Sequence, residues 1–348
     1  MRISRVEHSR INEVDFSNLK FGTVFSDHMY KCKYTAGVWR DPEIIPYGPL
    51  NLNPGTQVLH YAQSVFEGLK AFKNENDDLF LFRVEDNFNR LNQSAIRLSI
   101  PELPRDLFFD GLNKLLNLDK NWCKSTIGSS LYIRPFIFAS SECIKASSAN
   151  EFTFLIITSP CTTYYSGEMH VVVEQYFSRA ASGGVGYAKA SGNYAASFFP
   201  TIKANRKGFT QIIWTDSKTH KYIEESGTMN IWFVIDNKLV TPELNDSILA
   251  GITRDSIISI SKKYGIEFVE RKISVDEILA FSKNGKLTEA FGTGTAVTVT
   301  PINSITMGEN IINLNSGKTQ YAKFLKKKLQ EIQNGKVEDF SMWNYKVL

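Results

Sequence analysis

A glycine-rich stretch near the middle of the chain separates a predicted strand from a predicted helix. The stretch reads GGVGYAKASGNY from Gly183 to Tyr194, with a strand expected over 170–175 and a helix over 195–207. Small neighbours leave room for a bulky group beside the amine of Lys189, and the positive end of a nearby helix favours a neutral amine. Such an amine attacks aldehydes. Because most lysines in loops are solvated charges without a role, the stretch alone leaves both interpretations open.

The length of 348 residues predicts two domains. A hydrophobic content of 43% and a charged content of 22% are ordinary for a globular protein with a sizeable core. The net charge of +4 is small and spread along the chain, so the sequence indicates no nucleic-acid partner.

The histidines, cysteines and apolar runs exclude several other classes. Five histidines and four cysteines lack metal-ligand spacing, so we expect no metal site and a reducing compartment. The first residues, MRISRVEHSRINEVDF, lack the apolar core of a signal peptide. No apolar run approaches the ~20 residues of a membrane span. We therefore expect a cytoplasmic protein that does not bind membranes.

The order of the predicted elements divides the chain into two mixed domains joined by a linker. The expected limits are 1–158 for a small first domain, 159–169 for a linker punctuated by Pro and Gly, and 170–348 for a larger second domain. In the first domain, strands are expected over 20–33, 79–83, 130–138 and 152–158, and helices over 89–98 and 106–118. In the second, strands are expected over 170–175, 211–215, 221–224, 232–236, 238–240 and 287–291, and helices over 195–207 and from 251 to a stop at Gly265.

Three further segments supply what a lysine-bound pyridoxal phosphate needs. The cofactor requires an acid at its ring nitrogen, because only the protonated pyridinium withdraws electrons strongly. The segment EESGTMN (224–230) offers that acid. The phosphate requires backbone N–H donors, which the helix start at 251–253 and the turn at 294–296 provide. Each signal is weak alone, and their order along the chain makes the combination specific.

Taken together, six motifs resemble those of the branched-chain amino acid aminotransferases, which are pyridoxal phosphate enzymes of fold type IV. The motifs are VFEGLKAF (65–72), SLYIRPF (130–136), GGVGYAKASGNY (183–194), EESGTMNIW (224–232), LAGITR (249–254) and FGTGTA (291–296). The resemblance runs from about Phe21 to the C-terminus. It implies a two-domain α/β (α+β) fold, with a small α+β domain that has an antiparallel sheet and a larger barrel-like α/β domain.

The resemblance also implies roles at the cofactor. Lys189 matches the internal-aldimine lysine, which shuttles the proton between Cα and C4′. Glu225 matches the partner of the pyridinium nitrogen and Tyr194 the phenol that bonds the ring's O3′. The phosphate-binding positions correspond to Arg90, Ile252, Thr253 and Thr295.

Substrate positions follow from the same resemblance. Thr295 and Ala296 match the turn that receives the α-carboxylate, and Arg134 the position that helps receive a glutamate side chain. The positions that line the substrate pocket correspond to Phe21, Tyr61, Phe66, Tyr132, Tyr164 and Thr228. Core packing alone would also place several of these aromatic residues. Ile144 and Ala146 match a loop that the second subunit of a homodimer donates.

The implied activity is the reversible transfer of an amino group between leucine, isoleucine or valine and 2-oxoglutarate. The alternatives are a D-amino-acid aminotransferase, an aminodeoxychorismate lyase, or a ligand-binding relative without catalysis. Mammalian members of the family carry a CxxC pair just after the GTA turn, where this chain has Val297 and Thr300. We therefore expect no thiol switch at that place.

Overall fold

The computed structural model describes residues 1–126, 128–162, 167–314, 319–336 and 342–348, and the chain forms two compact units. The first unit comprises Met1–Tyr164, Ala188–Gly192 and Ile332–Leu348, and the second comprises Tyr165–Tyr187 and Asn193–Glu331. The short segment with Lys189 and the C-terminal residues therefore group with the first unit. The predicted domain limits at 158 and 170 stay a prediction.

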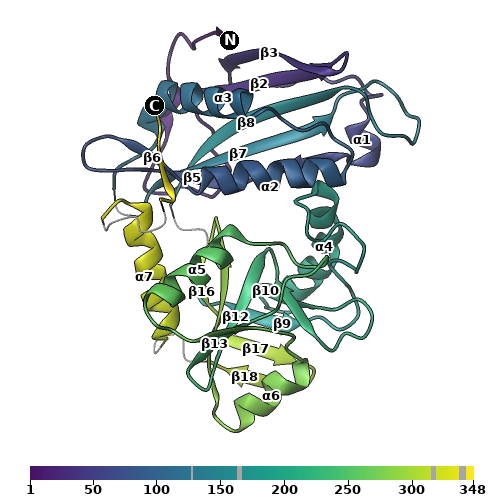
Figure 1. Ribbon diagram of the computed structural model, residues 1–348, viewed down its shortest axis with the longest axis vertical. Helices are drawn as coiled ribbons and strands as arrows, with labels where there is room; N and C mark the ends of the chain where they lie inside the picture. Colours follow the sequence, from purple (N-terminus) through teal and green to yellow (C-terminus); the bar gives the residue numbers. More distant parts are fainter. Residues whose placement is uncertain (127, 163–166, 315–318, 337–341) are drawn as a thin grey trace. The chain divides into compact units, whose positions relative to one another are not determined.

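The first unit is built on one sheet, which among the described residues has nine strands (Figure 1). Its order is β1-β3-β2-β8-β7-β5-β6-β19, with β4 also paired to β7, and every pair except β1 with β3 is antiparallel. The strands are β1 (Arg2–Ile3), β2 (His28–Thr35), β3 (Val38–Pro46), β4 (Ser64–Phe66), β5 (Leu69–Lys73), β6 (Leu79–Phe82), β7 (Ser130–Ala139), β8 (Phe152–Cys161) and β19 (Asn344–Lys346).

The centre of this sheet is the pair β7 and β8. They run in register from Ser130 opposite Cys161 to Ala139 opposite Phe152, and most of their residues are buried because the sheet is covered. Helix α3 packs on β2 and β3 (Figure 1), and α2 contacts β4. The helical segments of this unit are η1 (Arg10–Glu13), α1 (Val58–Tyr61), α2 (Val84–Arg97), α3 (Arg105–Leu118) and η2 (Lys120–Trp122).

Helix α2 has an unusual buried face. Its buried residues recur at helical spacing, as an amphipathic helix requires. Asn87, Arg90 and Ser94 lie on that face among apolar residues. Polar side chains on the inner face of a helix need hydrogen-bond partners inside the unit. The partners here are Glu67 and the backbone of Lys189.

The second unit holds a sheet that has ten strands among the described residues. Its main order is β14-β13-β12-β11-β10-β9-β17-β18, while β15 pairs with β12 and β16. Pairs of β9 with β10 and β17 are parallel, as is β13 with β14. The strands are β9 (His170–Val173), β10 (Gln211–Thr215), β11 (Ile223–Ser226), β12 (Met229–Ile235), β13 (Lys238–Thr241), β14 (Phe268–Glu270), β15 (Leu287–Gly294), β16 (Thr298–Pro301), β17 (Ser304–Met307) and β18 (Asn310–Asn313).

Strand β12 lies at the heart of this unit. All seven of its residues are buried, and it pairs with β11, β13 and β15. Helices α5 and α6 contact β15, and a capping box of Ser274 and Glu277 starts α6. The helices that follow the Lys189 segment are α4 (Ser191–Asn205), α5 (Ile252–Lys263), α6 (Val275–Lys283) and α7 (Tyr321–Gln333).

Most expected elements are present with shifted ends, and one was misplaced. The strand predicted over 20–33 begins only at His28, because residues 21–23 form a turn around Gly22, which has a φ of 71°. The strands and α-helices that were not predicted from the sequence are β1, β3, β4, β5, β14, β16, β17, β18, β19, α1, α6 and α7. Across the described residues, no helix is long and apolar enough to cross a bilayer.

The contact between α3 and β2 offers a test of packing. A Cβ on Gly111 of α3 would lie 2.6 Å from the ring of Tyr30, which is fully buried. Alanine favours helices over glycine by about 1 kcal/mol, but overpacking costs about 1–3 kcal/mol, so we expect Gly111→Ala to lower the free energy of unfolding. Urea unfolding measures the change. The control is Gly48→Ala, where a Cβ meets nothing within 4 Å; equal stability of the two variants would contradict the packing.

Candidate functional site

The first unit holds Lys189 by its backbone. Its carbonyl oxygen accepts a hydrogen bond from the amide of Phe66 at 3.1 Å, and its amide donates to the Ser94 hydroxyl of α2 at 2.9 Å. A bridge between Val65 and Ala190 extends this contact along β4. The ammonium nitrogen lies 4.9 Å from the centre of the Phe66 ring. As the sequence predicts, Lys189 lies just before a helix, since α4 begins at Ser191.

A fully buried carboxylate lies beside this segment. Glu67 contacts Arg90 in two places, Nε to Oε1 at 2.7 Å and Nη2 to Oε2 at 2.9 Å, and Asn87 donates to its Oε2 at 2.7 Å. Burial raises the pKa of Glu67, but the charges of Arg90 and Lys189 and the hydrogen bonds from Arg90 and Asn87 outweigh it and lower the pKa below its usual range. The polar face of α2 therefore surrounds an ionised carboxylate.

Three predicted pocket residues cluster around Arg134. Its guanidinium carbon lies 4.7 Å from the centre of the Phe66 ring and 5.3 Å from that of Tyr132, and Nη2 donates to the Tyr132 hydroxyl at 2.9 Å. Phe21 meets the edge of Tyr132 with 4.8 Å between ring centres. In the part of the chain that the structure describes, Arg134 has no carboxylate partner and its buried Nε has no hydrogen bond. An acidic ligand would supply the missing acceptor.

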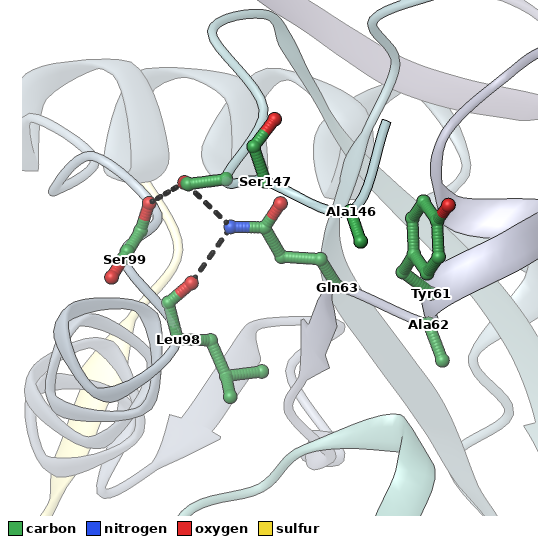
Figure 2. A pocket seen from close by; sticks show the side chains of 8 residues that line it. Tyr61, Ala62, Gln63, Leu98, Ser99, Ala146 and Ser147 are labelled. Atoms are coloured by element: carbon green, nitrogen blue, oxygen red, sulfur yellow. Dashed lines mark hydrogen bonds between the residues drawn. The ribbon is translucent and has the colours of Figure 1, made fainter. Parts of the chain in front are cut away.

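Tyr61, Ile144 and Ala146 form a different group. The Tyr61 hydroxyl donates to the Ile144 carbonyl oxygen, and Tyr61 and Ala146 line a cavity of about 410 Å³ (Figure 2). Gln63 lies in the middle and donates to the Leu98 carbonyl and the Ser148 hydroxyl. The lining residues are Tyr61, Ala62, Gln63, Leu98, Ser99, Ala146, Ser147 and Ser148. Lys189 does not line this cavity.

In the second unit, strand register brings Glu225 to the start of α5. Glu225 on β11 lies opposite Asn230 on β12. The two strands are joined by a tight turn in which Gly227 has a φ of 58°. The Leu249 amide donates to Glu225 Oε1 at 2.5 Å, and Asn230 donates to the Leu249 carbonyl at 2.9 Å. Two paired strands thus hold the backbone N–H and C=O of one residue, Leu249, just before Gly251.

The start of α5 and the turn after β15 are the predicted phosphate cradle. Helix α5 begins at Ile252, and its N-cap Gly251 provides no side-chain cap. A Cβ on Gly251 would lie 1.8 Å from Asn230 Oδ1, so only glycine fits there. Thr253 is buried, while Thr295 and Ala296 are partly exposed in the turn after Gly294. Gly294 lies near the backbone of Thr228, which is exposed.

Arg179, which the sequence analysis did not single out, connects Glu225 to the glycine-rich stretch. Its Nε lies 3.2 Å from Glu225 Oε2, and its Nη2 donates to the carbonyl oxygens of Gly186 and Ser247. Arg179 lies four residues before Gly183 and belongs to no recognisable motif, so its contact with Glu225 could be found only in the folded structure. Glu225, the carboxylate expected at the pyridinium nitrogen, is therefore also paired with the guanidinium of Arg179.

Glu224 is buried as well, although alternation along a strand predicts that only one of the two glutamates faces inward. Burial raises the pKa of Glu224 to about 7, and the charges of Glu225 and Asp216 act in the same direction, while Arg179 and a hydrogen bond with Ser247 oppose it. Its Oε2 has no hydrogen-bond partner among the described residues. Glu224 therefore keeps its proton over most of the range below pH 7 and is about half protonated near neutral pH.

Within each unit, the structure brings predicted residues together. The first unit groups Lys189, Phe66, Arg90, Phe21, Tyr132 and Arg134, and separately Tyr61, Ile144 and Ala146; the second unit groups Glu225, Thr228, Ile252, Thr253, Thr295 and Ala296. Tyr194 lies in the first turn of α4, partly buried. Tyr164 lies outside the described residues. Glu67 and Asn230 stand inside motifs quoted above, but their roles were not predicted.

These residues fit a phosphorylated pyridine aldehyde in chemistry. A helix start without a side-chain cap, beside a glycine that has no room for a Cβ, suits a phosphate. Glu225, which is held by the Leu249 amide and Arg179, could accept a hydrogen bond from a protonated ring nitrogen. Lys189, supported by Phe66 and Ser94, suits the aldehyde.

Known proteins are similar to this chain over nearly its whole length. The family described as amino-transferase class IV matches residues 64–305. Branched-chain-amino-acid aminotransferase 2 of Bacillus subtilis (strain 168) is 45% identical over 338 residues, 96% of this chain and 93% of the relative. The crystal structure of a branched-chain aminotransferase from Thermoproteus uzoniensis with norvaline has a TM-score of 0.77 at 25% identity and covers 92% of this chain and 100% of that one.

A further solved structure, from Escherichia coli, agrees in fold. This branched-chain amino acid aminotransferase has a TM-score of 0.73 at 25% identity and covers 92% of this chain and 99% of that one. Together these likenesses confirm the expected α/β fold class.

The raised pKa of Glu224 makes a pH-dependent prediction. Between pH 4.5 and about pH 7, the folded chain keeps a proton on Glu224 that the unfolded chain releases, so stability falls as pH rises through this window. Glutamine has no proton to lose. We therefore expect Glu224→Gln to gain thermal stability relative to wild type, by roughly 1–3 °C in Tm near pH 8, with the gain vanishing near pH 4.

Thermal unfolding at several pH values measures this gain. The control is Glu243→Gln, an exposed glutamate of the same unit, which should follow the wild type at every pH. A difference between Glu224→Gln and wild type that does not change with pH would show that Glu224 is ionised in the fold throughout.

Proposed function

The chain belongs to the class IV aminotransferases, and among them to the branched-chain-amino-acid aminotransferases, and on this basis we propose which residues carry the reaction and which acceptor it uses. It is a pyridoxal phosphate enzyme that transaminates branched-chain amino acids. The proposed exchange is between leucine, isoleucine or valine and 2-oxoglutarate. The observation that carries the proposal is the Lys189 segment, whose backbone is fixed between β4 and α2.

Lys189 is proposed to bind the cofactor aldehyde and to move the proton at the substrate Cα. When bound, pyridoxal phosphate withdraws electrons from Cα and so makes that proton removable. The two backbone hydrogen bonds of Lys189 support this role, because a proton donor must be held within reach of one atom. The Phe66 ring beside the amine limits the space around it.

Glu225 and Tyr194 are proposed to hold the cofactor ring. A carboxylate at the ring nitrogen keeps the proton there, and the support for Glu225 is its fixed position, set by the Leu249 amide and by Arg179. Tyr194 would donate to the ring hydroxyl oxygen. The acid is thus oriented before any ligand arrives.

The anionic groups are proposed to bind at backbone donors and one arginine. The amides of Ile252 and Thr253, the Thr295 hydroxyl and the guanidinium of Arg90 would hold the phosphate, and the turn at Thr295 and Ala296 the substrate α-carboxylate. Support comes from the helix start of α5, whose partial positive charge favours an anion, and from Gly251, which admits close approach.

The side-chain pocket must accept both an apolar group and a carboxylate. Phe21, Phe66 and Tyr132 would form the apolar wall, with Thr228 and Tyr164 as further lining, and Arg134 would receive the carboxylate of glutamate. Burying an unpaired carboxylate among aromatic rings costs several kcal/mol, so a cation must meet it. The support is that Arg134 lies between two of these rings without a carboxylate partner among the described residues.

A cytoplasmic homodimer is the proposed form of the enzyme. The loop with Ile144 and Ala146 would complete the active site of the second subunit, and Tyr61 would line the substrate pocket of its own subunit. The support is exposure: Tyr61 is 44% exposed and Ile144 is 70% exposed, which is high for large hydrophobic side chains, although the Tyr61 hydroxyl donates to the Ile144 backbone carbonyl. Four free cysteines fit a reducing compartment.

A panel of amino donors with 2-oxoglutarate as acceptor tests the activity and the role of Lys189 together. We expect L-leucine, L-isoleucine and L-valine to react and D-amino acids to fail. Lys189→Ala should bind the cofactor without a covalent bond and lose about 10²–10⁴-fold in turnover, since both the attachment and the proton transfer depend on the amine. The control is Lys203→Ala on α4.

Borohydride reduction of the holoenzyme followed by peptide mapping checks the attachment. Cofactor should be found on Lys189 in the wild type and in Lys203→Ala. Attachment at another lysine in an active Lys189→Ala variant would overturn the assignment, and reaction of D-amino acids alone would assign the chain to another activity of the fold.

Arg134 makes an asymmetric prediction about substrates. In Arg134→Met, kcat/KM for glutamate and 2-oxoglutarate should fall about 10- to 100-fold, because only the acidic substrates lose a charged hydrogen-bond partner. Leucine should be affected much less. Arg105→Met, which removes a surface arginine paired with Glu85, is the control. Equal losses for both classes would mean that Arg134 supports the fold or the cofactor.

A further inference from the structure

Glu67 stands in the motif VFEGLKAF, yet none of the roles described above uses it. Its side chain is 0% exposed and binds Arg90 in a two-point contact, with Asn87 as a third partner. A buried carboxylate with this set of partners needs a reason, because a buried ion pair is often no more stable than an apolar replacement.

We infer that Glu67 is a positioning residue for the cofactor phosphate: it fixes the guanidinium of Arg90 on the inner face of α2 in the orientation that meets the phosphate. This inference rests on the proposed role of Arg90. An arginine side chain has several rotatable bonds and loses entropy when one orientation is imposed on binding. A partner that fixes the guanidinium beforehand removes that cost from cofactor binding.

The geometry of the contact supports a positioning role. The two bonds join Nε and Nη2 of Arg90 to the two oxygens of Glu67, so one edge of the planar guanidinium is committed and the plane of the group is set. A guanidinium carries five N–H donors, and this contact uses two of them.

Glu67 is itself held from the backbone. The Glu67 amide donates to the Pro135 carbonyl of β7 at 2.8 Å, and the Gly68 amide donates to Glu67 Oε2 at 3.2 Å. Gly68 has no room for a Cβ, which would lie 2.1 Å from the Tyr132 hydroxyl. The carboxylate therefore stands on a rigid part of the first sheet, and so does the orientation it imposes on Arg90.

The same carboxylate also faces Lys189. The charged groups that act on Glu67 are Arg90 and Lys189, and both lower its pKa against the effect of burial. Ser94, which bonds the Lys189 amide, lies four residues after Arg90 on α2 and so on the same face. One helix face thus orients the proposed phosphate contact and the lysine segment together.

Equilibrium binding of two ligands to the full-length chain separates this role from a purely structural ion pair. Pyridoxamine 5′-phosphate forms no covalent bond with Lys189, and pyridoxamine lacks only the phosphate. In Glu67→Gln, the dissociation constant of the phosphorylated ligand should rise about 10- to 100-fold, the range for a lost hydrogen bond to a charged group. The dissociation constant of pyridoxamine should change less than about twofold.

A double-variant cycle shows whether the effect passes through Arg90. Arg90→Met should weaken the phosphorylated ligand selectively, and adding Glu67→Gln to it should weaken binding no further. Asp86→Asn is the matched control, since Asp86 pairs with Arg83 at the surface end of the same helix and should leave both ligands unaffected. If Glu67→Gln does not fold, Glu67→Asp retracts the charge by one methylene and should give the same selective loss, smaller in size.

Three results would overturn the inference: equal weakening of both ligands, no weakening of either, or independent losses that add in the double variant. Failure of the proposed function is a separate outcome, because it would appear in the wild type as absent transamination in the donor panel. If the wild type is active and Glu67→Gln weakens both ligands equally, only the positioning role of Glu67 is contradicted.

Discussion

The burial of carboxylates is the constraint on which the site in each unit depends. A carboxylate taken out of water must find a cation or several hydrogen bonds, or it is too costly to keep ionised. Glu67 in the first unit and Glu225 in the second are both almost wholly buried, and each contacts an arginine and a donor of another kind. Both side-chain partners of Glu67 lie on α2, whereas those of Glu225 are Arg179 and the Leu249 amide, so each carboxylate joins separate segments of its unit.

Pairing in the second unit fixes backbone as well as charge. Glu225 and Asn230 are opposite each other on β11 and β12; Glu225 accepts from the Leu249 N–H and Asn230 donates to the Leu249 C=O. A shift of one residue between these strands would turn both side chains to the other face and release the segment that leads into α5. The position of the helix start is therefore a consequence of strand register, and the missing Cβ of Gly251 lets Asn230 reach that close. The proposed ring-nitrogen acid and the proposed phosphate-binding helix end are thus placed by a single structural feature.

The sequence could predict the residues that chemistry requires, but not those that orient them. Lys189, Glu225 and the turn at Thr295 stand in motifs whose composition follows from what a cofactor needs, and strand and helix periods located the elements around them. Arg179 has no such mark, because any arginine in a loop has the same local appearance, and its contacts with Glu225 and Ser247 exist only in the folded unit. Alternation along β11 likewise could not predict that Glu224 and Glu225 are both buried, since it describes a strand with one solvated face and this strand has none.

The aromatic residues around Arg134 show how a charged guanidinium can be stabilised in a pocket lining that must also be apolar. The rings of Phe66 and Tyr132 present their electron-rich faces to the guanidinium, and this contact stabilises the charge without a carboxylate. A permanent acidic partner would stabilise Arg134 more strongly but would occupy the donors that a glutamate substrate needs. The rings leave those donors to a ligand, and they offer the same surface to a branched apolar side chain. The proposed dual recognition would therefore depend on the weakness of the cation–π contact, which is strong enough to hold the arginine in place and weak enough for a carboxylate to compete with it.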